Sequence, residues 1–530
     1  MRVSRDPWSP GPMDSNAFAH GVASGDPLPD RVVIWTHLAG AAPDTDVTVT
    51  WCVARDHRLS DLVAQGTAVA AADRDHTVHV DVTGLEPATT YFYGFDLPGA
   101  VSTVGRTRTL PAGHVPRVRF ATASCAKFNA GFFNAYERIA DRGEIGDLDF
   151  LLHLGDYIYE ASNTPPRNQT PGADIGRPFD PLHECVSLTD YRTRYRQYVA
   201  DPSVQRVRAA LPVIAAIDDH ELADGAWRGG ADNHAESIAG PWADRRQAAF
   251  QAREEWLPIR RPDRRDSSRV YRHVPLGDLA DLVLTDARSR RDQPVGGEAM
   301  ADTTRTALGA EQRAWLLDQL ASSSASWKLW GNPSVLSTTF RADLPEDLVE
   351  PLRKLKLMHP DEVACDPDQW DGYPAERDAI LAHIEERGID DVVVLSGDIH
   401  VGLALEVHRD PFAAAATGAA PIAVELVTAS LTSQNLDDKL GYAYGGSRRV
   451  QERFLEAFPH ARWADFDGHG YLAVDLDHQR LEATWCFVDD VLAPSDDEFR
   501  AATYRVPRGR AELVPAIHPL LTRSVGGLSR

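Results

Sequence analysis

A chain of 530 residues is long enough to bury a sizeable core, and it favours two domains or one large domain with an attachment. Its formal net charge of −23 argues against a nonspecific grip on nucleic acid or on an anionic membrane, because counterion release needs clustered Lys and Arg. Five cysteines without a CxxC pair exclude a zinc ribbon and a dense disulfide scaffold. No window of ~18 residues is apolar enough to predict a transmembrane segment, and no signal peptide is visible.

The N-terminal part predicts a small β domain. Short segments rich in β-branched and aromatic residues, separated by Gly, Pro and Asp turns, occur at 32–38, 47–54, 76–82 and 89–97. Within 47–54, apolar and polar residues alternate as in a half-buried strand of a sandwich. We expect a tail over 1–16, a β-sandwich domain over 17–110 and a linker over 111–116. Since this domain carries no cluster of ligand-type residues, we expect it to be a structural attachment.

Beyond the linker, buried-type strands alternate with amphipathic helical segments, a rhythm typical of an α/β fold. Helices are predicted within 131–145, 187–201, 310–323 and 374–388, and a late hairpin from 468–477 and 481–488. The loop over 162–184, rich in Pro, Gly and Asn, is predicted to lie at the rim of the site. We place a catalytic domain at 117–500 and a C-terminal extension at 501–530.

The segment Phe150 to Glu160 organises the predicted site. Its apolar run stops at Gly155, and a carboxylate, Asp156, follows at once. Open α/β sheets place their chemistry beyond the carboxyl ends of their strands. Four other predicted strands also end in ligand-type residues: Cys125, the run Asp218-Asp219-His220-Glu221, Asp286, and the run Asp398-Ile399-His400. The pattern predicts one metal centre assembled from several strand ends.

The residue types at these ends predict two different metal ions. Asp156 is the candidate carboxylate that bridges both ions and holds them close enough to clamp one phosphate. A thiolate, a phenolate and an imidazole suit iron or zinc, and this half is assigned to Cys125, Tyr159 and His400. Hard oxygen donors favour calcium, magnesium or manganese, and this half is assigned to Asp219 and Asp398.

A histidine next to the second half completes the predicted chemistry. His220 follows Asp219 directly and is available to protonate a leaving alkoxide near neutral pH. Each motif alone has an ordinary structural explanation: the DDHE run could cap a helix, and His400 or Tyr159 could serve packing. Only the ordered set of Cys, Gly-Asp-x-x-Tyr, Asp-His-Glu and Gly-Asp-x-His at strand ends is specific.

This set resembles the PhoD family of alkaline phosphatases and phosphodiesterases, within the calcineurin-like metallophosphoesterases. The resemblance covers most of the chain and includes FAHGVASGDPLPDRVVIWTHL (18–38), HLGDYIYE, DDHELADGAW and LSGDIHVGLALE. It implies an α/β fold with a metallophosphoesterase β-sandwich core flanked by helices, preceded by a fibronectin-like all-β domain. It also implies a secreted, periplasmic or cell-wall-associated protein exported through the twin-arginine route, and we expect a monomer.

The resemblance further implies a metal set. It assigns a ferric ion (Fe3+) to Cys125, Asp156, Tyr159 and His400, and calcium (Ca2+) to Asp156, Asp219 and Asp398, with Mn2+, Zn2+ or Mg2+ as alternatives at the second site. The bridging hydroxide or oxo group would attack phosphorus in line without a covalent enzyme intermediate, and His220 would stabilise the phosphoryl group and protonate the leaving group. Two stretches depart from the family pattern, Ala223-Asp224-Gly225 and Val401-Gly402-Leu403.

Three functions stay open from the sequence. A phosphatase acting on monoesters needs cationic groups for the terminal phosphate, and Lys127 and Arg288 could supply this charge. A phosphodiesterase of phospholipase D type would act on phospholipid head groups. A calcium-stabilised surface-binding protein would bind metal without turnover, and would leave Cys125, Tyr159 and His220 without a role.

Overall fold

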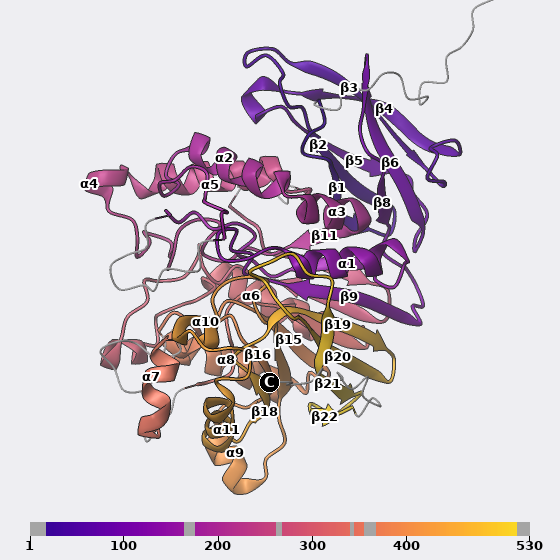
Figure 1. Ribbon diagram of the computed structural model, residues 1–530. Helices are drawn as coiled ribbons and strands as arrows, with labels where there is room; N and C mark the ends of the chain where they lie inside the picture. The colour runs from indigo at the N-terminus through magenta and orange to yellow at the C-terminus, as the bar shows by residue number, and fades with distance from the viewer. Residues whose placement is uncertain (1–16, 164–174, 261–267, 340–343, 355–366, 517–530) are drawn as a thin grey trace, which may run out of the picture.

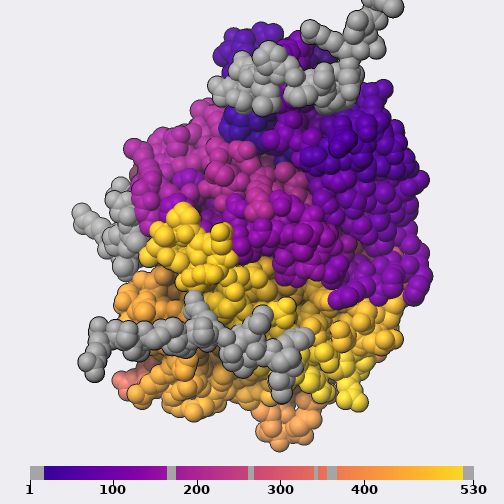
Figure 2. All heavy atoms as spheres, turned by 45° about the vertical axis from the view of Figure 1, so that its right-hand side comes forward, coloured from indigo at the N-terminus to yellow at the C-terminus, as the bar shows by residue number. Residues whose placement is uncertain are grey.

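The computed structural model describes residues 17–163, 175–260, 268–339, 344–354 and 367–516 (Figure 1). The N-terminal part is all β, apart from a 3-10 turn at Ala72–Arg74. Its strands are β1 (Val22–Leu28), β2 (Arg31–His37), β3 (Val47–Ala54), β4 (Leu62–Ala70), β5 (Thr77–Thr83), β6 (Thr90–Leu97), β7 (Ala100–Val101) and β8 (Gly105–Arg108). In Figure 2 these indigo and purple residues form one end of the body, and the orange and yellow C-terminal segments form the other.

A ten-stranded sheet runs through both parts of the chain, in the order β22-β21-β20-β19-β9-β10-β11-β1-β2-β5. Its later strands are β9 (Arg117–Ala123), β10 (Phe150–His153), β11 (Pro212–Ala215), β19 (His469–Asp477), β20 (Arg480–Val488), β21 (Glu498–Pro507) and β22 (Val514–Pro515). Strand β1 pairs parallel with β11, with Ser24 opposite Pro212. The N-terminal strands therefore extend the central sheet.

The N-terminal strands also form a sandwich of their own. Strands β4, β3, β6 and β7, with β8 on β6, make a five-stranded sheet. It packs on β2 and β5 through a shared apolar core that includes Val32, Ile34, Val49, Tyr91 and Phe95. One layer of this sandwich is thus the end of the ten-stranded sheet, which ties the N-terminal part firmly to the rest.

A seven-stranded sheet forms the second large layer, in the order β12-β13-β14-β15-β17-β16-β18. Its strands are β12 (Arg272–Leu276), β13 (Ala280–Leu284), β14 (Trp327–Gly331), β15 (Val392–Ser396), β16 (Gly402–Val407), β17 (Ala423–Val427) and β18 (Ala461–Asp465). Phe120 and Phe150 of the first sheet share one buried cluster with Leu282, Leu329 and Leu426 of the second. The two sheets therefore pack face to face.

Helices cover the outer faces of this pair of sheets (Figure 1). α1 (Asn134–Glu144), α2 (Leu188–Ala200), α3 (Pro202–Ala210) and α5 (Trp242–Trp256) pack on the first sheet, in a cluster that joins Tyr136 and Tyr195 to Leu151 and Val213. α6 (Ala310–Ser322) and α8 (Pro374–Arg387) pack on the second, where Leu316 and Ile380 contact its core. The remaining helices are α4 (Glu236–Ala239), α7 (Glu346–Lys354), α9 (Pro411–Thr417), α10 (Leu436–Leu440) and α11 (Arg448–Ala457), with short 3-10 turns at Gly297–Ala301 and Trp370–Gly372.

Local sequence signals account for several helix ends. Ser187 caps α2 in a capping box with Asp190, and α8 stops at Gly388, whose φ of 60° is left-handed. The four predicted helices and the late hairpin of β19 and β20 are present. Strand β4 was not predicted, because Gln65 and Gly66 interrupt its apolar pattern. Strand β21 runs across position 500, and the domain boundaries stay a prediction.

Residues 164–174 of the 162–184 loop lie outside the described residues, as do the tail over 1–16 and residues 517–530. Among the described segments, none of the helices combines the length and the hydropathy that a bilayer crossing requires.

Candidate metal centre

The topology brings the carboxyl ends of several strands to one edge of the two large sheets. Strands β9, β10 and β11 are parallel neighbours in the first sheet, and β13, β14, β15 and β17 are parallel neighbours in the second. The loops after them carry the sequence-predicted ligands: Cys125 after β9, Asp156 and Tyr159 after β10, Asp219 after β11, and Asp398 and His400 after β15. This edge is where open sheets place ligands.

The backbone is left-handed at four of these positions. φ is 59° at Cys125, 55° at Asp156, 70° at Asp398 and 65° at His400. Residues with a Cβ rarely adopt this region, and such strain gathers at functional sites. Gly155 has φ of 122°, and a Cβ there would lie 2.5 Å from the Asp218 Cβ. Only glycine therefore lets the loop after β10 approach the loop after β11.

Three groups of ligand atoms share Asp156, and one of them joins Asp156 and Asp219 to His220. The atoms of Cys125, Asp156 and His400 lie within 4.8 Å of one another, and so do those of Asp156, Asp218, Asp219 and Asp398. The Tyr159 hydroxyl donates to Asp156 Oδ2 at 2.8 Å and lies 3.3 Å from His400 Nε2. All six residues that the sequence singled out as metal ligands therefore meet at one place, with Asp156 in the middle.

The buried carboxylates and the thiol of the centre favour a bound cation. Burial raises the pKa of Asp218 and Asp398, Arg288 lowers it, and the neighbouring carboxylates raise it further. Burial likewise raises the pKa of Asp156 and of the Cys125 thiol. The Oδ1 atom of Asp219 is buried without a hydrogen-bond partner. Buried carboxylates are normally paired or bind metals, so this donor set fits a group of positive charge at its centre.

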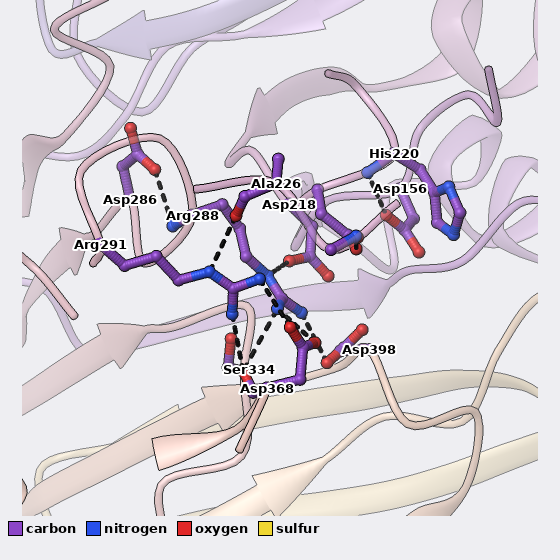
Figure 3. A network of polar contacts seen from close by, with 12 residues as sticks. Asp156, Asp218, His220, Ala226, Asp286, Arg288, Arg291, Ser334, Asp368 and Asp398 are labelled. Atoms are coloured by element: carbon purple, nitrogen blue, oxygen red, sulfur yellow. Dashed lines mark hydrogen bonds and ion pairs between the residues drawn. The ribbon is translucent and has the colours of Figure 1, made fainter. Parts of the chain in front are cut away.

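Arg288 lies among the aspartates of the centre (Figure 3). Arg288 is fully buried, donates from Nε to Asp218, and forms ion pairs of 2.6 Å with both Asp368 and Asp398. Arg291 contacts the other oxygen of Asp368 at 2.6 Å. Burial would raise the pKa of Asp368, but the two arginines hold it well below its usual range. The chain thus holds Asp218 and Asp398 in place through a buried ionic network.

The candidate acid His220 is oriented by Glu160. Its Nδ1 lies 2.7 Å from Glu160 Oε2, and its ring packs 4.0 Å from the Tyr159 ring. Burial would raise the pKa of Glu160, but His220 and the further donor Asn233 lower it to about 2. Burial would lower the pKa of His220, but Glu160 and the adjacent aspartates raise it well above its usual value. The Glu160 carboxylate therefore stabilises the charged form of the imidazole.

Two other predicted residues occupy less central positions. Lys127 Nζ lies 5.6 Å from the centre of the Tyr159 ring, on the cysteine side of the centre. Asp286, at the end of β13, accepts from the backbone N–H groups of Arg288 and Ser289 at 3.0 and 2.8 Å. Its carboxylate shapes the loop that carries Arg288 and does not join the groups of ligand atoms.

Sequence reasoning missed several residues that contact the centre. Glu160 ends the quoted HLGDYIYE segment and Asp218 begins the DDHE run, so both lay within recognised motifs but were given no specific role. No local sequence motif marked Ser433, which donates to the Tyr159 hydroxyl at 2.6 Å, or Asp368, which pairs with Arg288. The Nδ1–H of His400 donates to the Gln434 carbonyl at 3.0 Å, which leaves Nε2 as the metal-binding atom.

Known proteins resemble this chain along almost its whole length. The PhoD-like phosphatase family matches residues 120–485, and the N-terminal domain of PhoD-like phosphatases matches residues 6–111. Alkaline phosphatase D of Bacillus subtilis (strain 168) is 32% identical over 504 residues, which cover 91% of this chain and 79% of that protein. A solved structure titled "Structure of PhoD" has a TM-score of 0.83 and 30% identity, covering 98% of this chain and 95% of that chain.

Proposed function

Because this chain belongs to the PhoD-like phosphatase family and is a phosphoric ester hydrolase, we propose that it hydrolyses phosphate esters at a two-metal centre built around Asp156. The observation that carries the proposal is the sharing of Asp156 by a cysteine–histidine group and a group of four aspartates. A shared carboxylate is the arrangement that holds two cations close enough to act on one phosphate. Family membership sets aside the surface-binding alternative.

The donor chemistry supports different ions on the two sides. Cys125, Tyr159 and His400 supply sulfur, phenolate and imidazole, which favour iron or zinc. Asp219 and Asp398, with Asp218 beside them, supply only oxygen, which favours calcium, magnesium or manganese. We therefore propose Fe3+ on the first side and Ca2+ on the second. The unpartnered Oδ1 of Asp219 supports an ion at this position.

The face-to-face sheets support a metallophosphoesterase core. Two layers share one apolar core, and parallel strands of both end at the candidate centre. The Val401-Gly402-Leu403 departure lies in this scaffold, because Val401 and Leu403 pack in a buried cluster with Phe454. A Cβ at Gly402 would lie 2.9 Å from the Trp463 ring, so the departure serves packing behind the centre.

The protein's own groups would orient the ester and move one proton. When bound, the two ions would polarise the phosphoryl oxygens and supply an ionised water as nucleophile. Asp156 and the Arg288 network would hold the carboxylates at fixed positions, which favours in-line geometry. His220, kept protonated by Glu160, would give its proton to the leaving alkoxide.

Arg288 is better suited to positioning than to contact with substrate phosphate. Its guanidinium is fully buried, and its nitrogens contact three aspartates. Lys127, which lies beside Tyr159, is the better candidate for a cationic contact to substrate. The preference for monoesters or for diesters, including phospholipid head groups, depends on whether the space around Lys127 and Tyr159 accommodates a second ester group.

Hydrolysis of one chromogenic phosphate monoester and its matching diester would test the proposal. The preparation should be quantified for metals and assayed with and without calcium chelation. Calcium-dependent turnover with iron in the sample would support the mixed centre, and the monoester to diester ratio would choose between phosphatase and phosphodiesterase. Full turnover by a preparation that holds neither iron nor any divalent metal would refute it.

A further inference from the structure

A second group of metal-ligating side chains lies far from the candidate centre. His114, Asp278 and His478 place their ligand atoms within 4.8 Å of one another. His114 precedes β9 and Cys125 follows it, and a seven-residue strand is about 23 Å long at about 3.3 Å per residue. The group therefore lies at the opposite edge of the sheets from Asp156.

Three separate segments meet there. His114 belongs to the stretch between β8 and β9, Asp278 to the turn between β12 and β13, and His478 to the turn between β19 and β20. The turn between β12 and β13 fits closely against the stretch before β9, because a Cβ at Gly277 would lie 2.5 Å from the Gly113 carbonyl oxygen. One ion bound here would join one turn of each large sheet to the stretch before β9.

Backbone and side-chain contacts hold two of the three ligands in place. Asp278 Oδ1 accepts from the Val115 N–H at 2.8 Å, and the Asp278 N–H donates to the Gly113 carbonyl at 2.9 Å. His478 Nδ1 lies 2.8 Å from the Ser326 hydroxyl. Metal-binding histidines usually have their second nitrogen bonded in this way, which sets the ring orientation.

The remaining nitrogen of His478 is directed toward the carboxylate without bonding to it. His478 Nε2 is buried, has no hydrogen-bond partner, and lies 3.6 Å from Asp278 Oδ1. The other carboxylate oxygen lies 2.9 Å from His114 Nδ1. Two imidazoles and one carboxylate are the donors that zinc and similar borderline cations prefer.

From this arrangement we propose that His114, Asp278 and His478 bind a divalent cation of the zinc class, with water completing the coordination. The His114 and His478 rings are stacked, with planes 8° apart and centroids 5.0 Å apart, so one ion cannot lie in both ring planes. The His114 side chain is 74% exposed and can turn to present a nitrogen. Asp278 and His478 need little movement.

The ion would act as a structural clasp. It would cross-link the stretch before β9 to one turn of each large sheet, and would not touch the phosphate-binding edge. A ligand that binds only the folded protein raises its stability. The site should therefore change heat resistance while leaving turnover unchanged.

Zinc uptake by the holoprotein tests the proposal. The wild type and the variants His114→Ala, His478→Gln and His57→Ala, all loaded with their catalytic metals, are dialysed against micromolar Zn2+ and analysed for metal content and turnover. His57 is the matched control, because it is exposed, lies in the turn between β3 and β4 and contacts the Phe92 ring outside the His114 group. Thermal unfolding is recorded with and without Zn2+.

The wild type and His57→Ala should take up one more zinc per chain than His114→Ala and His478→Gln, whose affinity should be at least ~10-fold weaker. Zinc should raise the melting temperature of only the first two, and all four should turn over phosphate ester equally. Equal zinc uptake by all four proteins, or no additional zinc in the wild type, would overturn the proposal. Because turnover is measured on the same samples, failure of the clasp is distinguishable from failure of the phosphoesterase centre.

Discussion

Replacing Glu160 with glutamine tests whether His220 is the proton donor. Glu160 is fully buried and lies 2.7 Å from His220 Nδ1, and it raises the pKa of the imidazole. Glutamine has nearly the same shape but no charge, so it removes the stabilisation of the imidazolium. The Asp224 N–H and Asn233 amide that now donate to Glu160 Oε1, at 2.7 and 2.8 Å, can still donate to the glutamine oxygen.

The expected loss follows from the strength of this contact. A hydrogen bond to a charged group contributes about 1.5–3 kcal/mol. Since about 1.4 kcal/mol corresponds to a factor of ten in rate, kcat should fall about 10- to 150-fold in Glu160→Gln. His220→Ala, which removes the acid itself, should lose about 100- to 10,000-fold. Neither variant changes a predicted metal ligand, so both should retain their metals.

The assay compares two leaving groups. An alkyl phosphate expels an alkoxide that needs a proton, whereas 4-nitrophenolate is stable without one, so the loss should be larger for the alkyl ester. Glu184→Gln is the matched control, because Glu184 is a partly buried glutamate that pairs with Arg245 at 2.7 Å. A Glu160→Gln enzyme with full metal content and wild-type kcat on the alkyl ester would refute the assignment of His220.

Three further changes probe the centre and the fold. Asp156→Ala should lose both metals and turnover, as measured by elemental analysis and kcat. Full activity in this variant would refute the assignment of the centre. Arg288→Met leaves Asp218 and its neighbours without their buried partner, so the free energy of unfolding should fall by about 3–5 kcal/mol in urea titrations; unchanged stability would contradict this role. Burial lowers the pKa of His37 from 6.5 to about 2. The unfolded chain therefore binds a proton at His37 below pH 6.5 while the folded protein does not, so the free energy of unfolding falls with pH, by about 2 kcal/mol at pH 5. His37→Asn should therefore show a shallower fall in melting temperature between pH 7 and 5, and an identical fall would argue against His37.

The predicted ligands were recognisable because strand ends carry local signals. Gly155 and Asp156 follow an apolar run, and a buried strand that ends in a carboxylate is unusual enough to mark a site. Glu160 and Asp218 lay beside these motifs, but their contacts depend on loops that approach across the sheet. Asp368 lies 80 residues from Arg288 in sequence, and no periodicity predicts that they form an ion pair.

The role of the N-terminal part also depended on tertiary contacts. Alternating apolar residues correctly indicated strands, and the structure shows an all-β region there. The pattern could not show that β1 pairs with β11, because strand pairing is a choice of partner and register that the residues of one strand do not specify alone. For the same reason, the meeting of His114 with Asp278 and His478 was not predictable from their spacing.

The residue types of the predicted ligands, the strand ends that carry them, the shared role of Asp156 and the resemblance to a phosphoesterase family could be read from the sequence alone. Hydrophobic periodicity and the flanking glycines are local properties, so they can be read along the chain. Tertiary packing was needed to show that the predicted ligand atoms meet at one place, that Glu160 orients His220 and that Arg288 is buried among aspartates. Those contacts arise where two sheets pack together, and the distances between their loops follow from that packing.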